Sequence, residues 1–248
     1  MSVFAAPEFL SDLVVASRTL RPAGDQIWSV MPEGGVGQRY DRRAAAYDRV
    51  VGSRLYNRLL WGSSPSAYAS FAAQAVRSGR GPMLDAGCGS LVFTAGIYPG
   101  ADRPLVLMDQ SLGMLEAARD RLRAVGGVFP ADTVLLQADL WDMPFMAECF
   151  SSVLSMGMLH LFEDVEGVVS RLARVVTPDG ALFLSSLVSQ TWVGRRYLAA
   201  LHRAGEVAAP RTEQQLLTTL HRAAPGQSGR IESRVEGSMA FLQVGRAT

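Results

Sequence analysis

The chain has 248 residues, of which 48% are hydrophobic and 19% are charged. This composition excludes a mainly disordered chain, and the formal net charge of +1 gives no overall field that would attract nucleic acid. The longest apolar runs are far shorter than the roughly 20 residues of a membrane span, and the N-terminus lacks the basic stretch of a signal peptide. Two cysteines, Cys88 and Cys149, are too few for a disulfide scaffold or a structural zinc site. We therefore expect a cytoplasmic protein with reduced thiols.

The chain changes character near residue 80. Residues 1–80 predict a helical N-terminal cap region, interrupted by Pro/Gly-rich breaks. Residues 81–248 predict one α/β domain, because short apolar runs alternate there with amphipathic stretches, as in βαβ units. The predicted strands are Pro82–Ala86, Leu105–Asp109, Thr133–Ala138, Ser152–Met156, Ala181–Ser185, Ile231–Glu236 and Met239–Val244. The turn Gly237-Ser238 predicts that the last two form an antiparallel hairpin, so we expect a doubly wound, mostly parallel sheet of seven strands.

Capping signals mark three helices within this domain. Ser111 is a good N-cap for a helix that ends at the glycines 126–127. The acidic residues Glu163, Asp164 and Glu166 begin a second helix, which has apolar residues at helical spacing. Thr212 and Gln215 have the spacing of a capping box before a third.

A glycine-rich turn follows the first predicted strand. Asp85 ends that strand, and Gly87 and Gly89 follow within four residues. Glycine is needed where the backbone must pass close to a ligand, because a side chain would collide. We expect a helix after this turn, and the next strand ends in Asp109, an acid that at this place in a βαβ unit can accept both hydroxyls of a ribose.

The type of nucleotide is restricted by the same residues. A phosphate-binding loop is a poor match because the chain has no lysine. The dinucleotide fingerprint is also a poor match, because its third glycine would be Val92 and the carboxylate of Asp85 would repel a pyrophosphate. An adenosine ligand with a cationic amino-acid tail fits better, and S-adenosylmethionine is such a ligand.

Five segments in this order resemble the class I S-adenosylmethionine-dependent methyltransferases, in particular their small-molecule (type 11/25) branch. They are LDAGCGS at 84–90, LMDQSLGML at 107–115, ADLWDMPF at 138–145, SMGMLH at 155–160 and RVVTPDG at 174–180. The resemblance covers residues 81–187 and implies a Rossmann-like fold. The chain departs from the family at Leu91, where a third glycine is common, and at Asp179, which replaces a glycine in a turn that Pro-Asp-Gly also suits.

The resemblance implies which residues bind S-adenosylmethionine and its product S-adenosylhomocysteine. Asp85 accepts from the amine end, Gly87, Cys88 and Gly89 form the turn, and Asp109 takes the ribose. The adenine lies along Gln110 and Met114, with Asp139 and the backbone of Leu140 at its edge, and the carbonyl of Met156 meets the amine. Asp85 could instead be a strand-end acid that caps the next helix, and Gln110 and Met114 could be surface and core residues.

His160 is the candidate catalytic residue, because the segment after the fourth strand faces the substrate in this family and a histidine can serve as a base near neutral pH. The plainer interpretation is a histidine at a helix start with a satisfied hydrogen bond. Tyr40 and Tyr47 share one face of a predicted helix and are candidates to lie over the cofactor. Cys88 has no partner base in the sequence, which favours a packing role over a nucleophilic one. No histidine has metal-ligand spacing, so we expect no metal.

Two further segments bear on the substrate. The arginine-rich stretch 39–58 could contact nucleic acid, but interleaved acids favour a solvated helix face. The segment 190–210 follows the fifth strand of the domain and, with the N-terminal region, is expected to cover the site. Neither segment names a substrate.

The sequence therefore predicts an enzyme that transfers a methyl group from S-adenosylmethionine to a small-molecule acceptor by in-line displacement. Two alternatives stay open: a cofactor-binding protein that has lost turnover, suggested by Leu91, and an RNA methyltransferase. A nicotinamide-dependent dehydrogenase is more distant. A small molecule is the expected partner, and a homodimer is compatible with the sequence.

Overall fold

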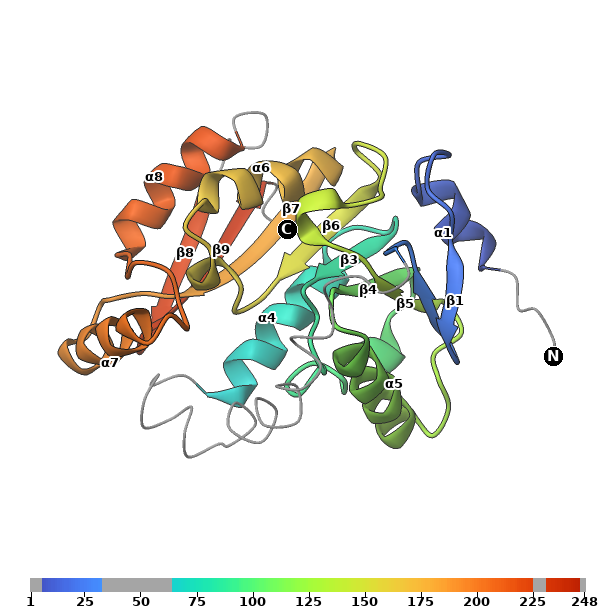
Figure 1. Ribbon diagram of the computed structural model, residues 1–248, viewed down its shortest axis with the longest axis horizontal. Helices are drawn as coiled ribbons and strands as arrows, with labels where there is room; N and C mark the ends of the chain where they lie inside the picture. Colours follow the sequence, from blue (N-terminus) through green and yellow to red (C-terminus); the bar gives the residue numbers. More distant parts are fainter. Residues whose placement is uncertain (1–5, 33–63, 225–230, 246–248) are drawn as a thin grey trace.

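The computed structural model describes residues 6–32, 64–224 and 231–245 (Figure 1). The predicted cofactor contacts Tyr40 and Tyr47, and the arginine-rich stretch 39–58, lie outside the described residues. In the described part, no helix is long and apolar enough to cross a membrane.

One mixed sheet runs through the molecule, in the order β1-β2-β5-β4-β3-β6-β7-β9-β8. Its strands are β1 (Arg21–Gly24), β2 (Ile27–Ser29), β3 (Met83–Ala86), β4 (Leu105–Asp109), β5 (Thr133–Gln137), β6 (Phe150–Ser155), β7 (Val176–Leu187), β8 (Ile231–Glu236) and β9 (Met239–Gly245). The strands from β2 to β7 pair in parallel, whereas β9 is antiparallel to β7 and to β8. This confirms the predicted α/β class and the antiparallel C-terminal hairpin.

The strand count and the N-terminal region differ from the prediction. The sheet has nine strands in the described residues, because β1 and β2 form an antiparallel hairpin whose second strand pairs with β5. The N-terminal region, predicted to be a helical cap with breaks, therefore also contains a β-hairpin that was not predicted. The sequence signal is weak because β2 has only three residues, all buried, and so shows no alternation of buried and exposed positions. Pairing with β5 makes it a strand.

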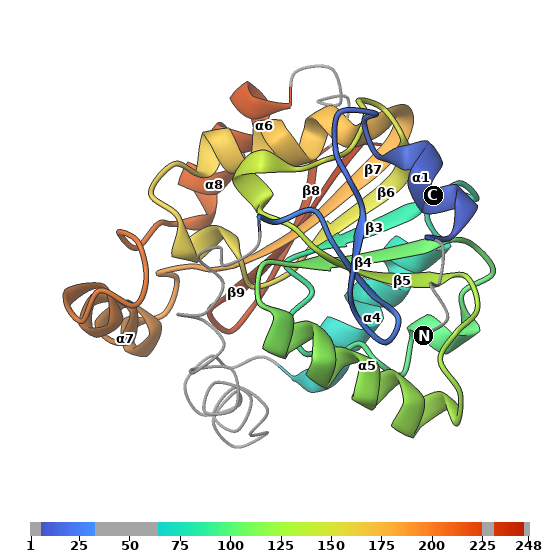
Figure 2. The ribbon, with the colours of Figure 1, turned by 45° about the vertical axis from the view of Figure 1, so that its right-hand side comes forward.

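Helices cover both faces of the sheet (Figures 1 and 2). They are α1 (Glu8–Leu13), α4 (Pro65–Arg77), α5 (Leu112–Gly126), α6 (Val165–Val175), α7 (Trp192–Arg203) and α8 (Glu213–Ala223), with 3₁₀ turns η2 (Tyr98–Gly100), η3 (Leu140–Asp142) and η4 (Leu159–Leu161). Apolar residues of α1, α6 and α8 share one core with the sheet, and those of α4 and α5 share the other. Figure 1 shows α7, from the segment 190–210, at the far left end of the molecule.

The predicted capping signals are confirmed. The hydroxyl of Ser111 accepts from the N–H of Met114, and Gly127, with φ +74°, ends α5. Asp164 caps α6, and Thr212 and Gln215 form the complete capping box of α8. These side chains satisfy N–H groups that a helix leaves unpaired at its start.

Candidate functional site

The candidate site lies where β3, β4 and β6 end. From β3 the chain winds outward through β4 and β5, and then returns to the other side of β3 with β6 and β7. Ligands of open α/β sheets bind in the crevice at such a reversal, beyond the carboxyl ends of the strands. The turn with Gly87 and Gly89 follows β3, Asp109 ends β4, and Met156 follows β6, so the fold brings these predicted residues to one edge.

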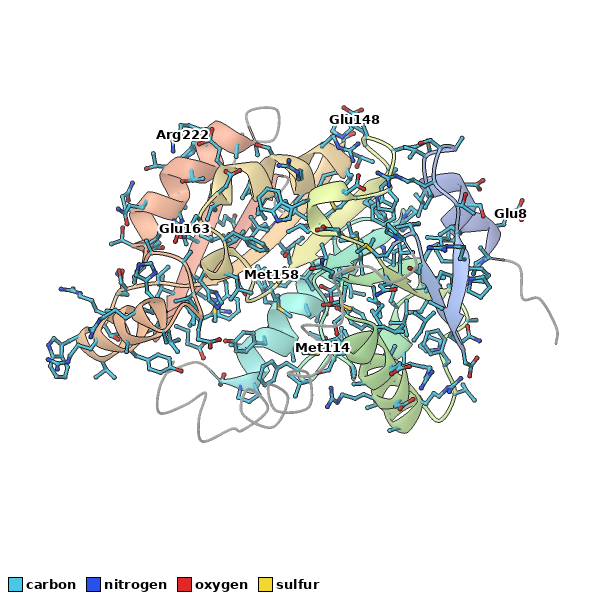
Figure 3. The ribbon with its side chains drawn as sticks, in the orientation of Figure 1. Glu8, Met114, Glu148, Met158, Glu163 and Arg222 are labelled. Atoms are coloured by element: carbon cyan, nitrogen blue, oxygen red, sulfur yellow. The ribbon has the colours of Figure 1, made fainter. Side chains whose placement is uncertain are left out.

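The two turn glycines have different surroundings. Both have positive φ, +73° at Gly87 and +56° at Gly89, which glycine adopts most readily. A Cβ at Gly89 would meet no atom of the described residues within 4 Å, whereas one at Gly87 would lie 2.7 Å from the sulfur and methyl group of Met158. Figure 3 shows Met158 and Met114 in the middle of the molecule. The backbone at Gly89 is therefore open to a ligand, and that at Gly87 is covered by Met158.

Asp109 holds the glycine turn to the end of β4. One carboxylate oxygen accepts from the N–H of Gly89 and the other from the N–H of Ser111, both at 2.9 Å. The side chain is half-buried. A carboxylate oxygen can accept more than one hydrogen bond, so Asp109 places two acceptor oxygens beside Gly89.

Asp85 lies beneath the turn, with 2% of its surface exposed. The hydroxyl of Tyr98 donates to its Oδ2 at 2.5 Å. Burial raises the pKa of Asp85 to about 7; the hydrogen bond from Tyr98 opposes this shift and the charge of Asp109 adds to it. Tyr98 belongs to η2, which replaces the predicted helix: residues 92–97 form turns instead. Asp85 thus has a protein partner in place of direct exposure to a ligand.

Cys88 lies in the same turn, and burial raises the pKa of its thiol well above the ordinary value, with the charges of Asp109 and Asp85 adding to the effect. A thiol in this environment stays protonated, which disfavours nucleophilic chemistry. In the described residues no group of three His, Cys, Asp or Glu side chains could hold a metal ion.

The predicted adenine contacts follow β4 and β5. Asp139 accepts from the N–H of Trp141 at 2.9 Å and so caps η3, while Leu140 beside it is buried. The carbonyl of Gln110 accepts from the side-chain amide of Gln137 at 3.1 Å. Met114, in the first turn of α5, is 9% exposed. Structural and ligand-binding roles are compatible at Asp139, because its carboxylate is half-buried.

His160 is anchored at the end of β7. Its Nδ1 accepts from the N–H of Leu187 at 3.3 Å, and its carbonyl accepts from the N–H of Ala208. Burial lowers the pKa of the imidazole to about 4. A neutral ring whose Nδ1 accepts a hydrogen bond carries its proton on Nε2, so His160 presents a donor there. This geometry is that of a histidine with a satisfied hydrogen bond, which is the structural interpretation given in the sequence analysis.

Three residues near the turn were not singled out from the sequence. Tyr98 contacts Asp85, Met158 covers Gly87, and the guanidinium of Arg121 in α5 donates to the carbonyl of Ser90. Met158 could have been found, because it lies within the segment 155–160 that predicts the substrate side. The other two have no local pattern, since each reaches the turn only through the tertiary fold.

Comparison with known proteins agrees with this geometry. Residues 84–184 match a family model described as a methyltransferase domain. The malonyl-[acyl-carrier protein] O-methyltransferase of Legionella pneumophila is 30% identical over 166 residues, which are 63% of this chain and 51% of that protein. Residues 84–184 are therefore similar to methyltransferase domains. The chain spans about half the length, or less, of the curated relatives it matches.

Solved structures share the fold of this chain. An S-adenosylmethionine-dependent methyltransferase from Thermotoga maritima has a TM-score of 0.58 at 16% identity, over 86% of this chain and 100% of the other. The [4+2]-cyclase SpnF has a TM-score of 0.64 at 16% identity, over 84% and 94%. The described activities of the two neighbours differ, so the likeness shows the fold alone.

Proposed function

We propose that the methyltransferase domain binds S-adenosylmethionine and transfers its methyl group to a small-molecule acceptor. The observation that carries the proposal is the open edge at Gly89, bordered by the carboxylate of Asp109. A ribose placed against this edge meets the two carboxylate oxygens of Asp109, and a carboxylate oxygen can accept more than one hydrogen bond. The match of residues 84–184 to the methyltransferase family supports the same ligand.

The protein's own contribution is mainly alignment. When bound, S-adenosylmethionine supplies a methyl group activated by a positive sulfur. Asp109 and Gly89 hold the ribose, Asp139 and Leu140 border the adenine, and the carbonyl of Met156 accepts from the amine. Because the donor is held in a fixed position, part of the entropy cost of aligning the methyl donor with the acceptor is met by binding and not in the reaction step. His160, as an Nε2–H donor, orients an oxygen of the acceptor, and a proton that the acceptor loses on methylation passes to water.

Isothermal titration calorimetry with S-adenosylmethionine and S-adenosylhomocysteine tests the proposal. We expect binding by the native chain and at least a tenfold loss in Asp109→Asn, since a hydrogen bond to a charged group contributes about 1.5–3 kcal/mol. Asp132→Asn is the matched control, because Asp132 is exposed and lies just before β5 at the opposite end of the parallel strands. No binding by the native chain, or equal binding by Asp109→Asn, overturns the proposal.

A cofactor-binding protein without turnover is the second candidate, favoured by the left-handed backbone of Leu91, with φ +59° where the family commonly has glycine. Release of S-adenosylhomocysteine with a panel of hydroxyl, amine and carboxylate acceptors distinguishes the methyltransferase from the binding protein.

If the protein were an RNA methyltransferase, it would bind RNA with an affinity that falls steeply with salt. We also propose that the protein is cytoplasmic. Light scattering distinguishes a monomer of 26.7 kDa from a homodimer.

A further inference from the structure

Leu91 occupies a backbone conformation that leucine adopts rarely. Its φ is +59°, and a bulky residue in this left-handed region is an outlier that the surrounding structure must stabilise. Its side chain is 2% exposed and belongs to the apolar core that α4 and α5 form with the sheet. The side chain therefore points into the core, away from solvent, and leaves the edge at Gly89 open.

Hydrogen bonds fix the peptide groups on both sides of Leu91. Its N–H donates to the carbonyl of Cys88, and its carbonyl accepts from the N–H groups of Thr94 and Ala95 at 3.1 and 3.0 Å. The peptide before it is held from outside the loop, because the carbonyl of Ser90 accepts from the guanidinium of Arg121. Ser90 is buried, so water is a poor substitute for this donor.

Helix α5 holds the loop at two places. Ser111, at its start, is tied to Asp109, which also accepts from the N–H of Gly89. Arg121, toward the other end of α5, reaches the carbonyl of Ser90, the next residue along the loop. The ligand-facing glycine and the strained leucine are thus fixed by one helix.

We propose that Arg121 is a positioning residue for the cofactor loop: by holding the Ser90 carbonyl it maintains Leu91 in the left-handed conformation and Gly89 in its ligand-facing orientation. The inference rests on the proposed function for its ligand. It also explains how the chain tolerates leucine where glycine would need no support. If the guanidinium of Arg121 only stabilised α5, the effect of removing it would not depend on which residue stands at position 91.

A double-mutant cycle tests the link. Arg121→Met removes the guanidinium and keeps most of the apolar stem. We expect it to weaken S-adenosylhomocysteine binding about tenfold in the native background, a coupling in the usual range for residues in contact. In the Leu91→Gly background the same change should cost less than about threefold, because glycine holds a positive φ unaided. Where Leu91→Gly folds poorly, Leu91→Asn replaces it, since asparagine tolerates this region.

Arg119→Met is the matched control. Arg119 lies on the same helix, and its guanidinium donates to Asp120, which is not part of the loop. It should leave binding within about twofold of native. Equal losses from Arg121→Met in both backgrounds, or no loss in the native one, overturn the inference.

Hydrogen exchange of the ligand-free protein gives a second readout that needs no cofactor. Arg121→Met should speed exchange at the amides of Leu91, Thr94 and Ala95, and Arg119→Met should not. If the native chain binds no S-adenosylhomocysteine, the proposed function fails, but the exchange result still decides the role of Arg121. Unchanged exchange at these amides overturns that role.

Discussion

The hydroxyl of Tyr98 donates to the carboxylate of Asp85 at 2.5 Å, directly beneath the glycine turn. This contact gives the strand-end acid a partner within the protein, and the acid is only 2% exposed. Asp85 therefore influences the conformation of the glycine turn from the protein interior, through its charge and its packing. The pKa of about 7 that follows from its burial makes this effect depend on pH.

Asp85→Asn should change how stability depends on pH. The unfolded carboxyl loses its proton near pH 3.8, whereas the folded one keeps it until about pH 7. The folded native chain therefore binds more protons between these values and loses stability as pH rises through them. Asparagine does not titrate, so the variant should gain stability relative to native as pH rises from 4 to 7. Urea unfolding at pH 5 and pH 8 measures this, with Asp132→Asn as the control; a constant difference between variant and native contradicts the prediction.

His160→Gln should reveal the opposite dependence. The unfolded imidazole takes up a proton near pH 6.5, but burial delays uptake in the folded chain to about pH 4. Stability from the neutral ring is thus lost as pH falls from 6.5 toward 4, and the variant should lose less there. The effects of Asp85 and His160 overlap between pH 4 and 6.5 and oppose each other, so each single variant has to be compared with native. NMR titration of His160 gives an independent value, and an ordinary midpoint near 6.5 would refute the assignment.

Substitutions at the two glycines of the turn should separate folding from binding. Gly89→Ala has open space for its Cβ, so we expect a stability loss of about 1–2 kcal/mol from the left-handed backbone together with a large loss of cofactor affinity. Gly87→Ala meets the same backbone cost and also the side chain of Met158. Adding Met158→Ala should recover part of the loss in Gly87→Ala and none of that in Gly89→Ala. Thermal unfolding and calorimetry provide both readouts; equal recovery in both would show that Met158 does not cover Gly87.

Arg103 should matter for stability alone. Its buried guanidinium donates to the carbonyls of Val76, Ser78, Gly79 and Pro82 and to the hydroxyl of Ser151. Arg103→Met would leave several of these buried acceptors unpaired, and we expect a loss of about 3 kcal/mol in unfolding free energy. The four carbonyls precede β3 and Ser151 lies near the start of β6, so the contacts are at the opposite end of these strands from the glycine turn. The Kd for S-adenosylhomocysteine, measured well below the melting temperature, should therefore stay within about twofold of native. A larger change in this Kd would show that the contacts of Arg103 are energetically coupled to the glycine turn, and would contradict the prediction.

The sequence was most informative where a residue's role is local. The capping residues Ser111 and Thr212 act within their own helix turns, so their spacing located them correctly. The strand Leu105–Asp109 was predicted to the residue, because a buried parallel strand is a continuous apolar run. The positions of Gly87, Gly89 and Asp109 at one edge followed from strand order.

Long-range contacts explain what the sequence did not reveal. Tyr98 and Arg121 reach the turn across 13 and 31 residues of chain, and no spacing rule links such pairs. The expected helix after the turn is absent because residues 92–97 form turns that lead into η2. The hairpin of β1 and β2 was missed because a three-residue strand is defined by its neighbour more than by its own composition.

That hairpin has a consequence for how the sheet meets its surroundings. Without it, β5 would be the border of the sheet, and its central residues Val134, Leu135 and Leu136 are apolar and fully enclosed. An apolar border strand with unpaired backbone groups is a template for self-association. The opposite border, β8, presents exposed Glu232 and Arg234, which discourage such pairing. A fragment trimmed to residues 84–184 would have β5 as an unpaired apolar edge strand and should aggregate. In the intact chain, the hairpin of β1 and β2 pairs with this edge.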